Sequence, residues 1–255
     1  MIDLNIDGTV AVAILNAPPA NTITPDWCRQ FHQVLDRVEA RADIKALHIK
    51  SALKIFCAGA DLKTVAGGFD RGSDGICEFI GALREYQVLF QRIENLPCTT
   101  VAEIAGAALG GGFEFALACD LRIIADEAKV GLPEVGLGLL PAIGGTQRLT
   151  AVCGEGTAKR LILTGEVVSG SEALRLGMVQ WSYPAAELSA QSDRLIDRLS
   201  RMPGRALRSA KACIATQASR PNLGFATEIS ESLDLFQSDE TRKAVAEFLN
   251  RKRPG

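Results

Sequence analysis

The sequence has few of the features that mark nucleic-acid-binding, membrane or secreted proteins. Aromatic residues make up only 5% of the 255 residues, the formal net charge is −2, and no basic stretch is interleaved with aromatics. Such a chain creates no general field that attracts nucleic acid or anionic lipid. It contains no run of 18 apolar residues, and its first residues lack the basic and apolar regions of a signal peptide. We therefore expect no nucleic-acid partner and no membrane span.

Closely spaced cysteines are also missing. The seven cysteines are spread along the chain: Cys28, Cys57, Cys77, Cys98, Cys119, Cys153 and Cys213. An odd number cannot all pair within one chain, and metal clusters usually require short Cys or His spacings. We expect reduced and mostly buried thiols, no metal site and a cytoplasmic location.

Histidine is scarce, and this scarcity limits the available chemistry. His32 lies in a helix with a packing face, and His48 lies in an alternating strand, so both are expected to pack or face solvent. The motifs GxGxxG after a strand, GxxxxGK[ST], GxSxG and HExxH are absent. General acid–base chemistry is therefore expected to fall to carboxylates.

The periodic segments predict an α/β protein with a helical end. Alternating residues over 2–7, the Asp7-Gly8 turn signal and the apolar stretch 10–15 predict a hairpin. Helical apolar spacing follows Thr24-Pro25, which is typical of a helix start. Other strands are expected at 46–49, 99–105 and 121–125, and everything after about residue 150 is expected to be helical. We predict an α/β core over 1–185 and an all-helical region over 186–255.

The most distinctive stretch is AGAALGGGFE, from Ala105 to Glu114. Three consecutive glycines, 110–112, separate a strand-like run from a helix-like run. Glycine lets other groups approach the backbone closely, and a helix N-terminus carries unpaired N–H groups with partial positive charge. A developing oxyanion would be stabilised there, with Glu114 one turn into the helix. The alternative is a tight turn that simply needs small residues.

A second small-residue turn, Phe56 to Lys63, lies between an expected strand and helix. It is either a plain loop in which Asp61 caps a helix or another place where bare N–H groups face a ligand. The glycine-rich stretch Gly67 to Gly75 has no periodicity, and it is either an active-site cover or a surface loop.

Two carboxylates stand out because they lie in glycine-rich, otherwise apolar segments. These are Glu114 and Glu134, with Glu103 in the preceding strand as a competitor. Burial raises the pKa of a carboxyl, and a second carboxylate nearby drives the two titrations apart. One acid and one base could then coexist near neutral pH. Sequence spacing alone leaves open whether Glu114 and Glu134 meet.

Three segments together resemble the crotonase (enoyl-CoA hydratase/isomerase) superfamily. They are FCAGADL at 56–62, AGAALGGGFEFALACDLRIIA at 105–125 and GLPEVGLGLLPAIGGTQRL at 131–149. Their order and spacing match the family pattern, and the resemblance extends over nearly the whole chain. It implies a crotonase-like spiral of ββα units with a C-terminal helical oligomerisation region. It also implies an acyl-CoA thioester as substrate, although many reactions share this scaffold.

The resemblance assigns roles to individual residues. The backbone N–H groups of Ala60 and Gly111 would form an oxyanion hole for the thioester oxygen. Glu114 and Glu134 would share acid–base catalysis, because the hydratases of this superfamily have glutamate at both matching positions. The residues that would bind substrate or CoA are Ala20, Ala58, Gly59, Asp61, Leu62 and Lys63.

The implied reaction is addition of water to a 2-enoyl-CoA to give a 3-hydroxyacyl-CoA, as in fatty acid β-oxidation. It needs no cofactor, since CoA is part of the substrate. The alternatives are another crotonase reaction, such as double-bond isomerisation or C–C hydrolysis, and a non-catalytic acyl-CoA-binding scaffold. The helical tail resembles the part that forms trimers, often paired as hexamers, and Arg251 or Lys252 is a candidate to hold CoA.

Overall fold

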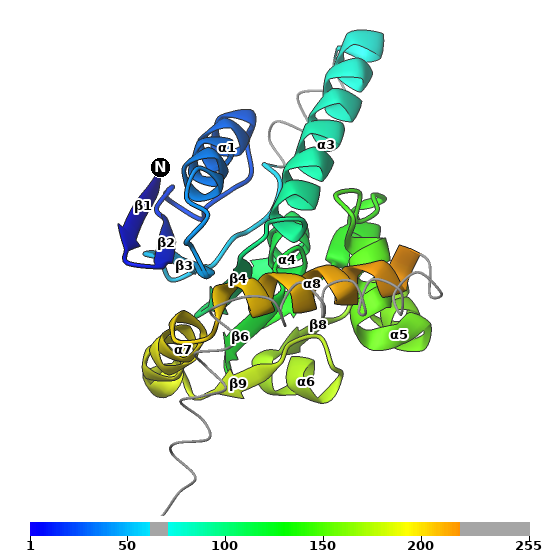
Figure 1. Ribbon diagram of the computed structural model, residues 1–255. Coiled ribbons are helices and arrows are strands. Elements are labelled where there is room, and N and C mark those ends of the chain that lie inside the picture. The colour runs from blue at the N-terminus through cyan, green and yellow to red at the C-terminus, as the bar shows by residue number, and fades with distance from the viewer. Residues whose placement is uncertain (62–70, 220–255) are drawn as a thin grey trace, which may run out of the picture.

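The computed structural model of the chain describes residues 1–61 and 71–219 (Figure 1). Its main sheet has six strands in the order β1-β2-β3-β4-β6-β9. Only the β1–β2 pairing is antiparallel, and the other neighbours are parallel. The strands are β1 Ile2–Asp7, β2 Val10–Leu15, β3 Ala46–Ser51, β4 Thr99–Ile104, β6 Leu121–Ala125 and β9 Trp181–Tyr183. The predicted α/β architecture and the N-terminal hairpin are confirmed.

A small second sheet lies beside the glycine turn, with strand order β5-β7-β8. Its strands are β5 Ala108–Leu109, β7 Lys129–Gly131 and β8 Val167–Ser169. The helices are α1 Pro25–Glu39, α3 Gly72–Glu94, α4 Gly111–Leu117, the 3₁₀ helix η1 Pro133–Leu137, α5 Gly145–Thr164, α6 Gly170–Arg175, α7 Ala185–Ser200 and α8 Gly204–Ser219. No helix among the described residues is both long and apolar enough to cross a membrane.

An aromatic cluster fixes α4, the helix that follows the three glycines. Phe115 packs against four rings, with ring centroids 5.1 to 5.7 Å apart. These rings come from α1, the segment after β3, and α3: Trp27, Phe31, Phe56 and Phe90. Such aromatic pairs add about 0.5–1.5 kcal/mol each beyond the area that they bury. The N-terminal end of α4 is therefore anchored by its own buried face.

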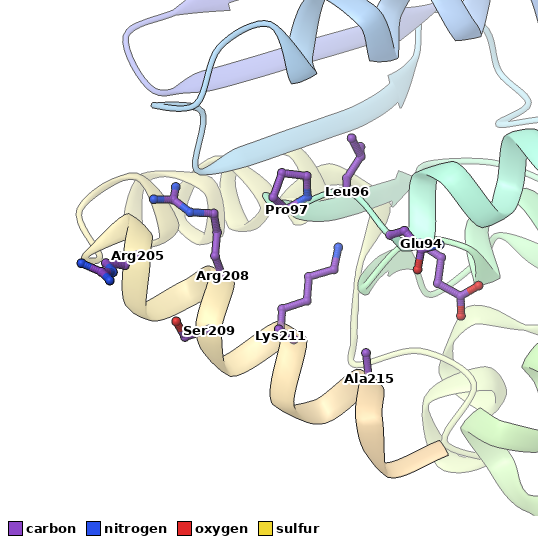
Figure 2. Close-up of a pocket in the computed structure, with 10 residues that line it drawn as sticks. Glu94, Leu96, Pro97, Arg205, Arg208, Ser209, Lys211 and Ala215 are labelled. Carbon is purple, nitrogen blue, oxygen red and sulfur yellow. The ribbon is translucent and has the colours of Figure 1, made fainter. Parts of the chain in front are cut away.

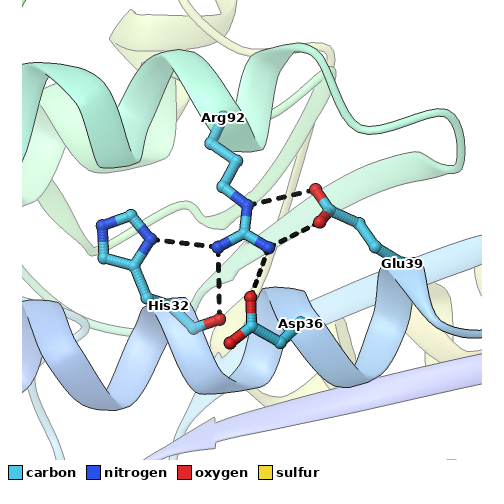
Figure 3. Close-up of polar contacts among 4 residues, drawn as sticks. All are labelled: His32, Asp36, Glu39 and Arg92. Carbon is cyan, nitrogen blue, oxygen red and sulfur yellow. Dashed lines mark hydrogen bonds and ion pairs between the residues drawn. The ribbon is translucent and has the colours of Figure 1, made fainter.

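One arginine joins α1 to α3 (Figure 3). The Arg92 guanidinium donates to both carboxylate oxygens of Glu39 and to Asp36, and it also contacts the ring and the carbonyl of His32. The Arg92 side chain is 25% exposed, so this pairing is only partly screened by water. It holds α1 against α3, and α3 borders the cavity described below.

The prediction that everything after residue 150 is helical is wrong in two places, β8 and β9. Each has three residues, too few to show the alternation that identifies a strand. The glycine-rich stretch 67–75 is also partly helical, because α3 begins at Gly72. Residues 67–70 of that stretch lie outside the described residues, as do residues 220–255 of the predicted helical region.

Candidate active site

The two small-residue turns predicted from the sequence meet. Leu109 N–H donates to the carbonyl of Cys57 at 3.2 Å, and Cys57 forms a bridge with Ala108. A Cβ on Gly59 would lie 2.9 Å from the nitrogen of Gly111, and a Cβ on Gly112 would overlap the Cys57 carbonyl. Both φ angles that shape the turns are positive, 86° at Gly59 and 53° at Gly110. The contact between the two backbones requires glycine at 59 and 112, and the positive φ favours glycine at 110.

The two predicted oxyanion donors lie side by side. A Cβ on Gly111 would be 3.4 Å from the nitrogen of Ala60, so the two amides are neighbours. Gly111 is the first residue of α4, where an amide has no acceptor within the helix. Among the hydrogen bonds of the described residues, neither amide donates to a protein acceptor. The arrangement leaves two N–H groups available to one oxygen atom of a ligand.

A cavity of about 920 Å³ opens beside these amides. Both glutamates singled out by the sequence, Glu114 and Glu134, line it together with Ala60 and Gly111. The rest of its wall is mainly apolar and includes Ile80, Leu83, Leu109, Leu137, Leu139, Leu140 and Ile143. A mostly apolar cavity with a few convergent polar groups is typical of a small-molecule site.

Glu114 is held in place by main-chain amides. Its side chain is buried, with 1% exposure, and its Oε1 accepts hydrogen bonds from the N–H groups of Ile143 at 2.8 Å and Gly145 at 2.7 Å. Burial raises the pKa of Glu114 from 4.5 to about 7, and the charge of Glu134 adds to the rise. The two amides and Arg148 act in the opposite direction. Glu114 can therefore exchange a proton near neutral pH.

Glu134 is the second acid in the cavity and is much less constrained. It lies in η1, and its Oε1 is 2.9 Å from the position that a Cβ on Gly110 would take. Its Oε2 is buried and has no hydrogen-bond partner among the described residues. Burial raises the pKa of Glu134. A buried carboxyl oxygen in this position is available to bind a proton or to accept a hydrogen bond from a ligand.

The other predicted site residues line the cavity, support the turn beside it or lie outside the described residues. Ala58 and Asp61 line the cavity. Ala20 accepts the Ala58 N–H at 3.0 Å, so it supports the turn from behind. Gly59 supplies the close approach described above, whereas Leu62 and Lys63 lie outside the described residues.

The competitor Glu103 does not reach the cavity. It accepts from His48 at 2.8 Å, and Ser192 of α7 contacts the same histidine nitrogen at 3.0 Å. All three side chains are buried. His48 is a packing residue, as expected from its strand, and Glu103 is used to join α7 to the sheet.

Sequence reasoning missed the groups that orient Glu114. The amides of Ile143 and Gly145 come from the turn before α5, and they carry no side-chain signal. The sequence signal that could have found this turn is the pair Gly144-Gly145, because paired glycines favour turns with positive φ. In the structure Gly144 has a φ of 102°. A turn of this kind exposes successive N–H groups, which suit an anionic carboxylate.

A second cavity of about 520 Å³ lies between α8 and the segment that precedes β4 (Figure 2). Arg208 and Lys211 of α8 extend toward this segment, and none of the predicted site residues lines it. The described residues contain no group of three His, Cys, Asp or Glu that could hold a metal ion. The described cysteines are all free thiols.

The chain is similar to known proteins over nearly its whole length. The model of the enoyl-CoA hydratase/isomerase family matches residues 5–255. A probable enoyl-CoA hydratase of Bacillus subtilis is 33% identical over 255 residues, which cover 99% of this chain and 97% of the relative. The fatty acid oxidation complex subunit alpha of Aliivibrio fischeri is 45% identical over 173 residues, 66% of this chain but 24% of that longer protein.

A solved structure extends the likeness to the fold. The crystal structure of an enoyl-CoA hydratase from Bacillus anthracis has a TM-score of 0.91 and 29% identity, covering 100% of this chain and 98% of that one. The fold is therefore the crotonase fold that the sequence motifs implied. With a family match over almost its full length, the chain belongs to the enoyl-CoA hydratase/isomerase family.

Proposed function

We propose that the protein is an enoyl-CoA hydratase, a hydro-lyase that adds water across the 2,3-double bond of a 2-enoyl-CoA to give a 3-hydroxyacyl-CoA. One observation carries the proposal: Glu114 and Glu134, both with raised pKa values, line the same cavity as the amides of Ala60 and Gly111. The names of the relatives support the same reaction.

The two amides account for the electrostatic part of catalysis. As water attacks C3, negative charge moves onto the thioester oxygen. The N–H groups of Ala60 and Gly111, preorganised by the contact between the two turns, would stabilise that charge. Loss of one donor of this kind typically costs about 2.7–4 kcal/mol of barrier.

The two glutamates account for the proton transfers. Glu114 uses Oε1 to accept from two amides, which leaves Oε2 to position and deprotonate the attacking water. Glu134, whose Oε2 has no partner in the part of the chain that the structure describes, would deliver a proton to C2. We assign the two a joint acid–base role, in which a pKa of about 7 suits Glu114 to both states.

The remaining assignments concern the residues on and next to the turn that contains Ala60. We infer that the segment from Ala58 to Asp61, together with Ala20, Leu62 and Lys63, lines the path of CoA. The proposed reaction uses no cofactor apart from the CoA of the substrate.

We also propose that the protein forms a homo-trimer or a dimer of trimers in the cytoplasm. Residues 1–185 would form the catalytic core and residues 186–255 the trimerisation region. The enzyme would act in fatty acid breakdown. The relative named a fatty acid oxidation subunit supports that pathway.

The test is a substrate panel with matched variants. In a panel of short, long and aromatic-derived 2-enoyl-CoA esters, the wild-type protein should remove the conjugated enoyl-thioester absorbance of at least one ester, with 3-hydroxyacyl-CoA as product. Glu114→Gln and Glu134→Gln should each lower kcat by about 10²–10⁴-fold while still binding acyl-CoA. Near-normal turnover in either variant would overturn the mechanism. Exclusive turnover of 3-enoyl or β-diketone thioesters would favour isomerisation or C–C hydrolysis, and binding without turnover would favour a scaffold.

A further inference from the structure

The turn that holds Glu114 is itself held from outside the cavity. Ile143 uses both of its backbone groups: its N–H donates to Glu114 Oε1 at 2.8 Å, and its carbonyl accepts from Arg148 Nη1 at 2.9 Å. Only one residue therefore separates the guanidinium from the carboxylate. Movement of Arg148 would move an amide that touches Glu114.

Arg148 contacts the turn in two further ways. Its own N–H donates to the Gly144 carbonyl at 2.9 Å, as part of the first turn of α5. Its guanidinium also fills the space that a Cβ on Gly144 would need. Gly144 has a φ of 102°, a conformation that favours glycine. Arg148 therefore covers the outer side of the backbone whose inner side faces Glu114.

The other side of Arg148 is tied to α3. Its Nε and Nη2 donate to Oε2 of Glu94 at 3.1 and 3.0 Å. The arginine side chain is 13% exposed and the glutamate 52%. Figure 2 shows the Glu94 carboxylate directed away from Arg208 and Lys211 of α8, so these cations do not compete for it.

We propose that Arg148 is a positioning residue for Glu114, and that with Glu94 it fixes the Ile143–Gly145 turn whose amides hold the Glu114 carboxylate. The proposal deepens the proposed function and rests on it, because it concerns how one of the two acids is oriented. Arg148 does not line the cavity, so a substrate bound there would not contact it.

The proposal predicts two effects of losing the guanidinium. A looser turn would let Glu114 leave its productive position, and a displacement of about 1 Å can lower turnover about 10²-fold. The ionised form of Glu114 would also lose stabilisation. Among the described residues, the charged groups that act on Glu114 are Glu134 of η1, which raises its pKa, and Arg148 of α5, which lowers it. The pKa of Glu114 should therefore rise.

The experiment measures the pH dependence of kcat and KM with but-2-enoyl-CoA. Arg148→Gln should lower kcat tenfold or more, leave KM within about threefold, and move the acid limb of kcat to higher pH. Arg148→Lys keeps the charge but loses the planar fork, so it should recover part of both effects. Glu94→Gln should also lower kcat and move the acid limb to higher pH, but by less than Arg148→Gln.

The matched control is Arg160→Gln on the same helix. Arg160 forms a two-hydrogen-bond pair with Glu166, far less buried than Arg148. Arg160→Gln should leave kcat and the pH dependence of kcat unchanged. A purely structural role for Arg148 would lower thermal stability in Arg148→Gln without moving the acid limb, and that outcome would overturn the proposal.

A readout without turnover separates this proposal from the proposed hydratase function. The side-chain carboxyl carbon of Glu114 can be followed by ¹³C NMR, with its signal assigned by loss in Glu114→Gln. Its titration should move to higher pH in Arg148→Gln, whether or not the wild type hydrates any enoyl-CoA. An unchanged titration would refute the positioning role, whereas a wild type without hydratase activity would refute only the function.

Discussion

Two buried glutamates, Glu103 in β4 and Glu114 in α4, show how differently one fold can treat the same side chain. The Glu103 carboxylate forms a hydrogen bond with His48, and Ser192 contacts the same ring nitrogen of that histidine. Burial alone would raise the pKa of Glu103, but the hydrogen bond and charge of His48, with the hydrogen bond of Ser192, lower it overall. The fold thus offsets the burial of this charge.

Glu114 receives two amide hydrogen bonds but faces another carboxylate instead of a cation. Burial and the charge of Glu134 outweigh the amides of Ile143 and Gly145, so its pKa rises to about 7. Burying a charge without a counterion is costly, and such perturbed groups cluster at functional sites. The contrast separates a glutamate that joins two elements from one that is kept ready to exchange a proton.

The largest expected effect is a gain in stability when Glu114 becomes neutral. A carboxyl whose folded pKa is raised destabilises the fold as pH increases from 4.5, and the whole cost is present above about 7. The rise in the pKa of Glu114 from 4.5 to about 7 corresponds to a loss of about 3 kcal/mol in the free energy of unfolding. In Glu114→Gln the amide oxygen can still accept from both N–H groups, so this variant should unfold at higher urea than wild type at pH 8 and near the wild-type midpoint at pH 4.5.

The matched control is Glu155→Gln on α5, where the glutamate side chain is 71% exposed. It should show the same small difference from wild type at both pH values. A Glu114→Gln protein that is no more stable at pH 8 than wild type would mean that the charge of Glu114 is well accommodated. The contrast with Glu103 would then fail.

A crowded glycine tests whether the position of Glu114 matters as much as its charge. A Cβ at Gly145 would lie 2.8 Å from Glu114 Oε1 and 2.9 Å from its Cγ. Gly145→Ala should push the carboxylate away and lower kcat for enoyl-CoA hydration by about 10²-fold. Gly156→Ala on the same helix meets nothing within 4 Å and should keep full activity. Equal activity in the two variants would show that Glu114 tolerates displacement.

The position of Glu114 at a helix start could be predicted from the local sequence, but the contacts that set its pKa could not. The three glycines before Glu114 predicted a helix start with exposed amides, and α4 begins at Gly111. The sequence also singled out Glu134, which lies in a short 3₁₀ helix. These signals are local because a tight turn constrains the residues that form it.

What escaped prediction depends on contacts between distant segments. His48 and Glu103 meet because β3 and β4 are parallel neighbours, and Ser192 arrives from α7 far along the chain. The short strands β8 and β9 exist through pairing with β7 and β6, not through a pattern of their own. Likewise, the link from Glu94 through Arg148 to the turn at Ile143 joins the ends of two helices.

The smallest expected effect comes from the other side of the contrast, where Glu103→Gln should reduce stability but not chemistry. Its folded pKa is lowered, so the stabilisation from its charge is present above about 4.5 and disappears as pH falls through the folded value. At pH 7 the variant should be less stable by about 1–3 kcal/mol, the usual cost of weakening a buried polar contact.

This deficit should shrink in urea titrations as pH falls from 4.5 through the lower folded pKa of Glu103, because the native Glu103 then becomes protonated as well. Turnover of enoyl-CoA per folded molecule should match wild type, since His48 and Ser192 hold Glu103 away from the cavity. If Glu103→Gln instead lowered kcat at full occupancy of the folded state, the two buried glutamates would be coupled. The separation between a structural and a catalytic carboxylate would then have to be abandoned.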